Sequence, residues 1–191
     1  MHEPVADRIV AERLSPVLDV GGGTGRLLEL LPTSRPAVVV DRSLTQLADA
    51  PRARVCADAA RLPVGPGLAG AVTMLWVLYH CDDPRVAVAE AWRTLRPGGL
   101  FVASTASRRN DPELTDGYPS TPFDAEEAST LVADVFGDVE VTAWDAPMAY
   151  LPDQAAVERY CRGHWLPRSA ADRVDPPVWL TKRGCLVYAR R

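Results

Sequence analysis

A glycine-rich turn follows an apolar run that contains an acidic residue. The run is Val17–Val20, with Asp19 inside it, and the glycines are Gly21, Gly22, Gly23 and Gly25. Glycine permits unusual backbone angles and lets a ligand approach the main chain without meeting a Cβ. The Asp19 carboxylate can accept a hydrogen bond, directly or through water, from the ammonium group of an amino acid, but it would serve a pyrophosphate poorly. These five residues indicate a site for a ligand with an amino-acid end.

The same turn could bind a dinucleotide or be purely structural. The dinucleotide pattern GxGxxG needs a third glycine, but Arg26 stands there when counting from Gly21, and Leu28 when counting from Gly23. NAD is therefore disfavoured, while a structural turn remains an alternative.

Two more acids follow the next two expected strands. Asp41 comes directly after residues 37–40, where an acceptor can take both hydroxyls of a ribose, and we place its neighbour Arg42 in the same site. Asp58 comes after residues 54–57, where a carboxylate can accept from an adenine amine while the N–H of Ala59 or Ala60 serves a ring nitrogen. Each acid alone could be a solvated loop residue or a helix cap. Together with Asp19 they predict a nucleoside site.

One histidine is placed to act on a second substrate. His80 comes four residues after Trp76, just beyond an expected strand, whereas His2 and His164 have no equivalent placement. It is our candidate for the catalytic residue, as general base or as an orienting hydrogen-bond donor. The alternative is that it caps the next helix or bonds to Asp82.

Short apolar runs alternate with segments of helical period along the first half of the chain. The expected strands are 17–20, 37–40, 71–76 and 100–104, and the expected helices are 25–31, 44–50 after Ser43 as N-cap, and 84–95. The last helix would be capped by Asp82 or Asp83 and would bury the face formed by Val88, Ala91, Trp92 and Leu95. Continuously apolar strands joined by helices predict a doubly wound, mostly parallel sheet of the α/β class.

The second half of the chain has a different pattern. Residues 107–122 are expected to form a loop, and Asp124 with Glu127 forms a capping box that opens a helix to Phe136, ended by Gly137. Strands are expected at 139–144 and 185–189, around an irregular insertion with a short helix near 153–161. The insertion holds aromatic side chains that could line an acceptor pocket or form a satellite core: Tyr150, Tyr160, His164 and Trp165.

Composition limits the classes of function. A length of 191 residues suits one domain, 1–191, and a net charge of −4 with a pI near 5.4 argues against nucleic-acid binding. The four cysteines, Cys56, Cys81, Cys161 and Cys185, lack zinc-ligand spacing and are expected to be reduced thiols, so no metal is predicted. No segment has the roughly 20 apolar residues of a membrane span. We therefore expect a cytoplasmic protein with no membrane contact.

The motifs resemble those of the class I S-adenosylmethionine (SAM)-dependent methyltransferases, in particular the group that acts on small molecules such as ubiquinone and menaquinone precursors. The similarity is nearly continuous from residue 17 to residue 104 and resumes in the last strand. The segments of this chain that are similar to the family's motifs are 19–25, Asp41, 58–63, 74–80 with Asp83-Pro84, 95–100 and 181–186.

This resemblance implies a Rossmann-like sheet of seven strands, with SAM as cofactor and S-adenosylhomocysteine as product. It places Leu75 and Trp76 beside the reacting methyl group and implies transfer to a small-molecule acceptor, with O- or C-methylation favoured. The alternative is a SAM-binding sensor without catalysis. Only 18 residues precede Asp19, so we expect a short N-terminal cap. A homodimer is an open expectation.

Overall fold

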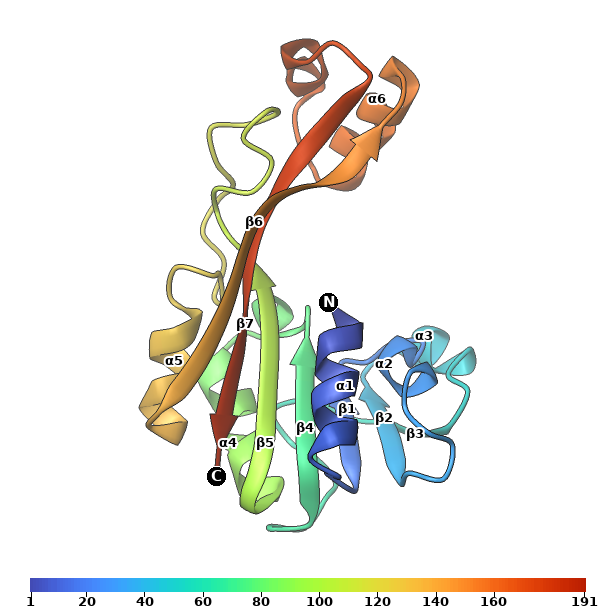
Figure 1. The fold of residues 1–191 in the computed structure, drawn as a ribbon, viewed down its shortest axis with the longest axis vertical. Helices are drawn as coiled ribbons and strands as arrows, with labels where there is room; N and C mark the ends of the chain where they lie inside the picture. Colours follow the sequence, from blue (N-terminus) through green and yellow to red (C-terminus); the bar gives the residue numbers. More distant parts are fainter.

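The computed structural model describes residues 1–191 and contains one seven-stranded sheet, as the sequence predicts (Figure 1). Its strand order is β3-β2-β1-β4-β5-β7-β6, and β7 runs antiparallel to both of its neighbours while the other pairs are parallel. The strands are β1 (Val17–Val20), β2 (Ala37–Asp41), β3 (Ala53–Cys56), β4 (Ala69–Leu75), β5 (Leu95–Ala106), β6 (Val139–Leu151) and β7 (Val178–Arg190).

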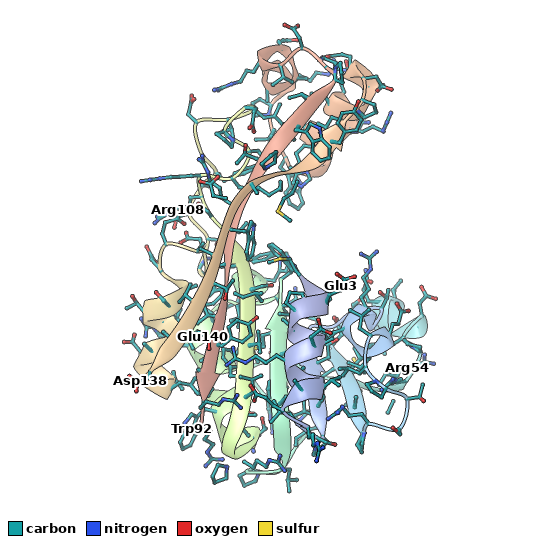
Figure 2. The ribbon with its side chains drawn as sticks, viewed as in Figure 1. Glu3, Arg54, Trp92, Arg108, Asp138 and Glu140 are labelled. Atoms are coloured by element: carbon teal, nitrogen blue, oxygen red, sulfur yellow. The ribbon has the colours of Figure 1, made fainter.

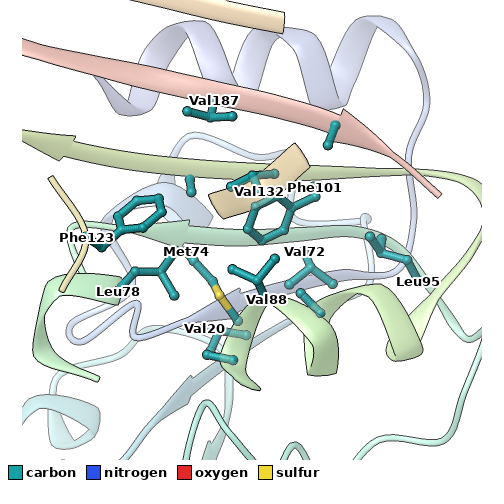
Figure 3. Packing of buried hydrophobic residues seen from close by; sticks show 14 of the residues in the cluster. Val20, Val72, Met74, Leu78, Val88, Leu95, Phe101, Phe123, Val132 and Val187 are labelled. Atoms are coloured by element: carbon teal, nitrogen blue, oxygen red, sulfur yellow. The ribbon is translucent and has the colours of Figure 1, made fainter. Parts of the chain in front are cut away.

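Helices cover both faces of the sheet. One face carries α1 (His2–Ala11), α2 (Arg26–Glu29) and α3 (Leu44–Ala48), whose buried residues share one apolar core. The other face carries α4 (Pro84–Thr94) and α5 (Ala128–Phe136) over a second core. In Figure 3, Met74 and Phe101 of neighbouring strands face Val88 and Val132 of these two helices. β4 is buried along its whole length, and Thr73 is its one polar side chain, which is the pattern of a strand covered on both faces.

Most of the expected helix boundaries are confirmed. Two other expectations, the capping box before α5 and the burial of Trp92, are wrong. Ser43 accepts a hydrogen bond from the Gln46 N–H, and Asp83 accepts one from the Arg85 N–H, so both cap their helices. The capping box before α5 is wrong: Asp124 is buried, and its carboxylate bonds to Ser120 Oγ and pairs with Arg108 instead. Trp92, labelled in Figure 2, was expected on the buried face of α4 but is 39% exposed. The Arg191 guanidinium lies over its ring, 4.0 Å from the centroid.

The insertion after Trp144 is more regular than expected. β6 continues to Leu151 and β7 already begins at Val178, and beyond the last β5 pair, Ala106 with Gly184, the two strands pair only with each other. This two-stranded ribbon leaves the body of the sheet and carries α6 (Gln154–Gly163) and the 3₁₀ helix η2 (Arg168–Arg173) at its far end (Figure 1).

A small third core holds α6 and η2 on the ribbon. It includes Val157 and Cys161 of α6 and Leu151 and Leu180 of the two strands. The remaining 3₁₀ helix, η1 (Leu78–His80), lies between β4 and α4. None of the helices is long and apolar enough to cross a membrane.

Candidate functional site

A cleft of about 710 Å³ opens at the carboxyl ends of β1, β2 and β4. This is the edge at which doubly wound sheets bind ligands. Nine of the site residues expected from the sequence line it: Gly21, Gly22, Gly23, Asp41, Arg42, Asp58, Ala59, Trp76 and His80. Asp19, Gly25 and Leu75 do not.

The glycine turn has a conformation that side chains would not tolerate. Gly21 and Gly23 have φ values of +68° and +53°, in the left-handed region that favours glycine. A Cβ on Gly22 would overlap Asp19 Oδ2, and a Cβ on Gly21 would overlap the Val77 side chain. The main chain of the turn is therefore bare toward the cleft, as a closely bound ligand requires.

Asp19 lies beneath this turn and not at its mouth. It is 2% exposed, because its neighbours in register on β2 and β4 enclose it, and its Oδ1 accepts a hydrogen bond from Thr73 Oγ1 at 2.8 Å. Burial raises its pKa to about 7, and the charge of Asp41 adds to the rise, against the opposing effect of the Thr73 bond. Our expectation of a carboxylate open to the ligand is thus corrected: Asp19 supports the turn from behind.

Asp41 ties the glycine turn to the next strand. Its Oδ2 accepts from the Gly23 N–H at 3.0 Å and its Oδ1 from the Ser43 N–H at 2.8 Å. Each carboxylate oxygen has two lone pairs, so both can accept one more bond from a ligand in the cleft.

Asp58 and Ala59 stand at the carboxyl end of β3. Asp58 Oδ1 accepts from the Ala60 N–H at 2.8 Å, which turns the chain back on itself. The Ala60 amide is therefore engaged within the protein. The Ala59 amide donates to no protein acceptor, so of the two candidates it is the one free to meet a ligand.

Gly25 and Leu75 serve packing. Gly25, with φ +80°, is the N-cap of α2, and a Cβ there would press on Val39 and Pro51. Leu75 belongs to the core under α1 and α2, because the alternation of β4 points it to that face.

Trp76 begins the segment after β4 in a strained backbone conformation. Its φ is +61°, although it is not glycine, and its N–H donates to Ser104 Oγ at 3.1 Å and to the Ser104 carbonyl at 3.2 Å. Its ring meets Trp144 edge-on at 5.9 Å between centroids. Strained residues of this kind concentrate at functional sites, where the surrounding structure holds them in place.

Two histidines line the cleft. His80 lies on η1 with its side chain exposed and its ring tilted by 55° against that of Tyr79. It neither bonds to Asp82 nor caps α4, which Asp83 does. His2 also reaches the cleft, from the first turn of α1, so our statement that it has no such placement is wrong. Burial, helped by the nearby N-terminal amino group and by Arg26, lowers the pKa of His2. Sequence spacing gave no sign of this, because α1 folds back over the sheet.

The cleft has further polar residues that the sequence did not indicate as site residues, among them Arg26, Gln46, Asp82 and Asp83. None of the four expected aromatic and histidine residues of the insertion lines it. Tyr160 packs against the third core, His164 stacks on Tyr160, Tyr150 pairs with Trp179, and Trp165 is solvent-exposed. Tyr160 therefore belongs to a satellite core, which was the alternative to its lining an acceptor pocket.

Comparison with known proteins gives consistent results. The model of a family described as "Methyltransferase domain" matches residues 18–103. A demethylmenaquinone methyltransferase of Mycolicibacterium gilvum is 31% identical over 156 residues, which cover 78% of this chain and 68% of that protein. A malonyl-[acyl-carrier protein] O-methyltransferase of a Marinomonas species is 33% identical over 113 residues, which cover 53% of this chain and 42% of that protein.

Solved structures agree on the fold. A SAM-dependent methyltransferase from Archaeoglobus fulgidus superposes with a TM-score of 0.65 at 16% identity, over 100% of this chain and 95% of that one. The chain spans less than half the length of several sequence relatives, 36% to 47% in five of them. Those relatives carry methyltransferase names, and nothing in them favours a non-catalytic sensor.

Proposed function

This chain belongs to the SAM-dependent methyltransferase family, and from that premise we propose that it transfers the methyl group of SAM to an oxygen or carbon atom of a small-molecule acceptor. The observation that carries the proposal is the cleft itself. A bare glycine turn, an acid after β2 and an acid with a free amide after β3 converge there from three separate segments.

The residues present fit SAM. Asp41 has lone pairs left for ribose hydroxyls, and Asp58 with the Ala59 N–H offers the acceptor and donor that an adenine edge needs. The turn Gly21–Gly23 lets the amino-acid end of SAM approach the main chain. The positive charge of its ammonium group would favour the ionised form of Asp19, which lies beneath the turn and has a pKa raised to about 7. Arg42 lies beside Asp41 at the rim of the cleft.

SAM, when bound, supplies a methyl group that is already activated on a sulfonium, so the protein's main work is positioning. Trp76 and Val77 form the apolar wall at the end of β4, where they exclude water from the approach of an acceptor. His80, exposed at the same end of the cleft, is the residue we assign to remove or hold the acceptor's proton at an imidazole nitrogen. Such a base matters only for an acceptor that starts protonated.

The names of the sequence relatives and the net charge of the chain both indicate the chemical class of the acceptor. The relatives named above act, by name, on a demethylmenaquinone and on a malonyl group, which supports C- or O-methylation. A net charge of −4 disfavours a nucleic acid as acceptor. We further propose that residues 1–191 form a single domain and work in the cytoplasm, which the four free cysteines support.

The test is calorimetric titration with SAM and S-adenosylhomocysteine. Asp41→Ala should weaken both by about 10- to 100-fold, because a charge-assisted hydrogen bond contributes about 1.5–3 kcal/mol. Asp49→Ala, an exposed acid at the end of α3, is the matched control and should bind normally. Wild-type protein that binds neither ligand would refute the proposal, whereas unchanged affinity in Asp41→Ala would remove only Asp41 from the site. Labelled SAM with a metabolite panel then identifies the acceptor.

A further inference from the structure

The cleft has one arginine beside the glycine turn. Arg26 follows the turn directly, as the first residue of α2, and lines the cleft. The other arginine of the cleft, Arg42, adjoins Asp41 at the carboxyl end of β2, and no lysine lines the cleft. Arg26 is therefore the permanent positive charge that the segment after β1 brings to the cleft, whereas the segments after β2 and β3 bring the acids assigned to the nucleoside.

Arg26 has no partner within the protein. Its side chain is exposed and forms neither an ion pair nor a hydrogen bond. Glu29, one turn further along α2, does not pair with it. A guanidinium has N–H donors in a planar fork that matches the two oxygens of a carboxylate. All of these donors are free to bond to a ligand in the cleft.

His2 is the other basic residue at this end of the cleft. The charge of Arg26 acts on it, so the two side chains lie near each other although they come from different helices, α1 and α2. Burial, the N-terminal amino group and Arg26 together lower the pKa of His2 from its ordinary value of 6.5. His2 is therefore mainly neutral at pH 7, and Arg26 is the group that can offer an anion a positive charge.

The amino-acid end of SAM carries an anionic group that still lacks a counterpart in the cleft. The ribose, the adenine and the ammonium group are each assigned to an acid or an amide, but the carboxylate is not. The glycine turn, where this end of SAM approaches the main chain, leaves the N–H groups of Gly22 and Thr24 without a protein acceptor. Arg26 stands two residues after Thr24. Arginine can bind a carboxylate through two parallel hydrogen bonds, which are roughly twice as strong as those between neutral groups.

We propose that the Arg26 guanidinium binds the carboxylate of SAM and is the residue by which the cleft selects a ligand with an intact amino-acid end. This inference rests on the proposed function, because it needs SAM in the cleft. A carboxylate on the methyl acceptor is the alternative anion. It fits less well, because the acceptor approaches at Trp76 and His80 after β4, whereas Arg26 follows the turn after β1.

The experiment is calorimetric titration of the full chain with SAM and with decarboxylated SAM, which keeps the nucleoside, the sulfonium and the ammonium group and lacks only the carboxylate. We expect wild-type protein to bind SAM more tightly than the decarboxylated form, by roughly tenfold or more. Arg26→Gln should remove most of this preference, because it weakens SAM by about 10- to 100-fold, as for loss of a charge-assisted hydrogen bond, without weakening decarboxylated SAM. The matched control is Arg42→Gln, the other arginine of the cleft, which should change both affinities by the same factor.

The melting temperature of each variant shows whether its fold is intact. Equal affinity of the wild type for the two ligands, or a preference for SAM that survives Arg26→Gln, would overturn the inference and leave the proposed function standing. Equal weakening of both ligands in Arg26→Gln would also overturn it, since the residue would then shape the cleft without selecting the carboxylate. Wild-type protein that binds neither ligand would instead refute the proposed function.

The same titrations at several pH values separate Arg26 from His2. Because arginine stays charged and both ligands carry the ammonium group, the preference for SAM should be constant between about pH 6 and pH 8. A preference that is lost as the pH rises through this range would assign the carboxylate to protonated His2 and overturn the role of Arg26.

Discussion

At the scale of single residues, the most unusual group is the buried carboxylate of Asp19. Its place under the glycine turn lets it influence a ligand without touching solvent. Burial raises its pKa to about 7, whereas an aspartate in the unfolded chain ionises near 4. The folded protein therefore holds a proton at mildly acidic pH that the unfolded chain has released.

The raised pKa of Asp19 makes the stability of the folded protein depend on pH. The contribution of Asp19 to stability is fully present below about pH 4 and is lost as pH rises through about 7, with a slope of up to about 1.4 kcal/mol per pH unit. Asn keeps the size of the side chain and can still bond to Thr73. In urea unfolding between pH 5 and 8, Asp19→Asn should therefore become progressively more stable relative to wild type. A constant difference across this range would show that Asp19 is ionised throughout.

His80 and His2 both line the cleft, so each is a candidate for the general base. With an acceptor that must lose a proton, His80→Gln should bind SAM normally and lose roughly 10²–10⁴-fold in kcat, as expected for removal of a general base. His2→Gln is the matched substitution and should retain most of kcat. If the loss instead follows His2→Gln, the base is His2. If His80→Gln is fully active while His80→Ala is not, His80 orients the acceptor by a hydrogen bond.

At the scale of elements, a buried polar cluster fixes the ribbon to the loop after β5. Asp111 is completely buried and accepts from Tyr118 Oη at 2.8 Å, Tyr160 Oη at 3.0 Å and Lys182 Nζ at 2.8 Å. Burial and the Asp111 charge raise the pKa of both tyrosines, so both hydroxyls remain donors. The cluster thus joins three elements, the loop, α6 and β7, through one carboxylate.

Breaking this cluster should be costly. Asp111→Ala would leave the Lys182 charge without its partner, and removing one member of a buried pair costs about 3–5 kcal/mol. Asp116→Ala, in the same loop, removes an exposed pair with Arg173 and should cost far less, because water screens the charges of a surface ion pair. Urea unfolding of both variants measures the two costs. Comparable values would mean that the cluster is solvated and does not hold the ribbon.

The elements that the sequence predicted well are those whose pattern is local. β1, β2 and β4 are short apolar runs bounded by turn residues, and α3 and α4 carry their own caps, Ser43 and Asp83. The ribbon was missed because a two-stranded ribbon exposes much of its surface and so lacks an apolar run. Its strand β6 also contains Pro147 beside a register shift, which in sequence indicates a break.

At the scale of the whole molecule, some residues of the cleft could be predicted from the sequence and others could not. Asp41, Asp58 and the glycine turn were placed together because parallel strands end at one edge of the sheet. His2 was missed because its position depends on how α1 packs, and the Asp111 cluster because its members are separated by up to 71 positions in the chain. Both depend on tertiary packing, which leaves no periodic trace in the sequence.

The last prediction concerns whether the body and the ribbon unfold together. The ribbon has its own small core, but it is continuous with β6 and β7 of the main sheet, so one cooperative transition is expected in scanning calorimetry. S-adenosylhomocysteine at about 100 times its Kd should stabilise the folded state by about 2.7 kcal/mol and raise the melting temperature by roughly 5–10 °C for a chain of this size. Far-ultraviolet circular dichroism and tryptophan fluorescence should shift by the same amount, because Trp179 reports on the ribbon and Trp76 on the cleft. Two transitions, of which the ligand moves only one, would show that residues 1–191 do not form a single cooperative domain.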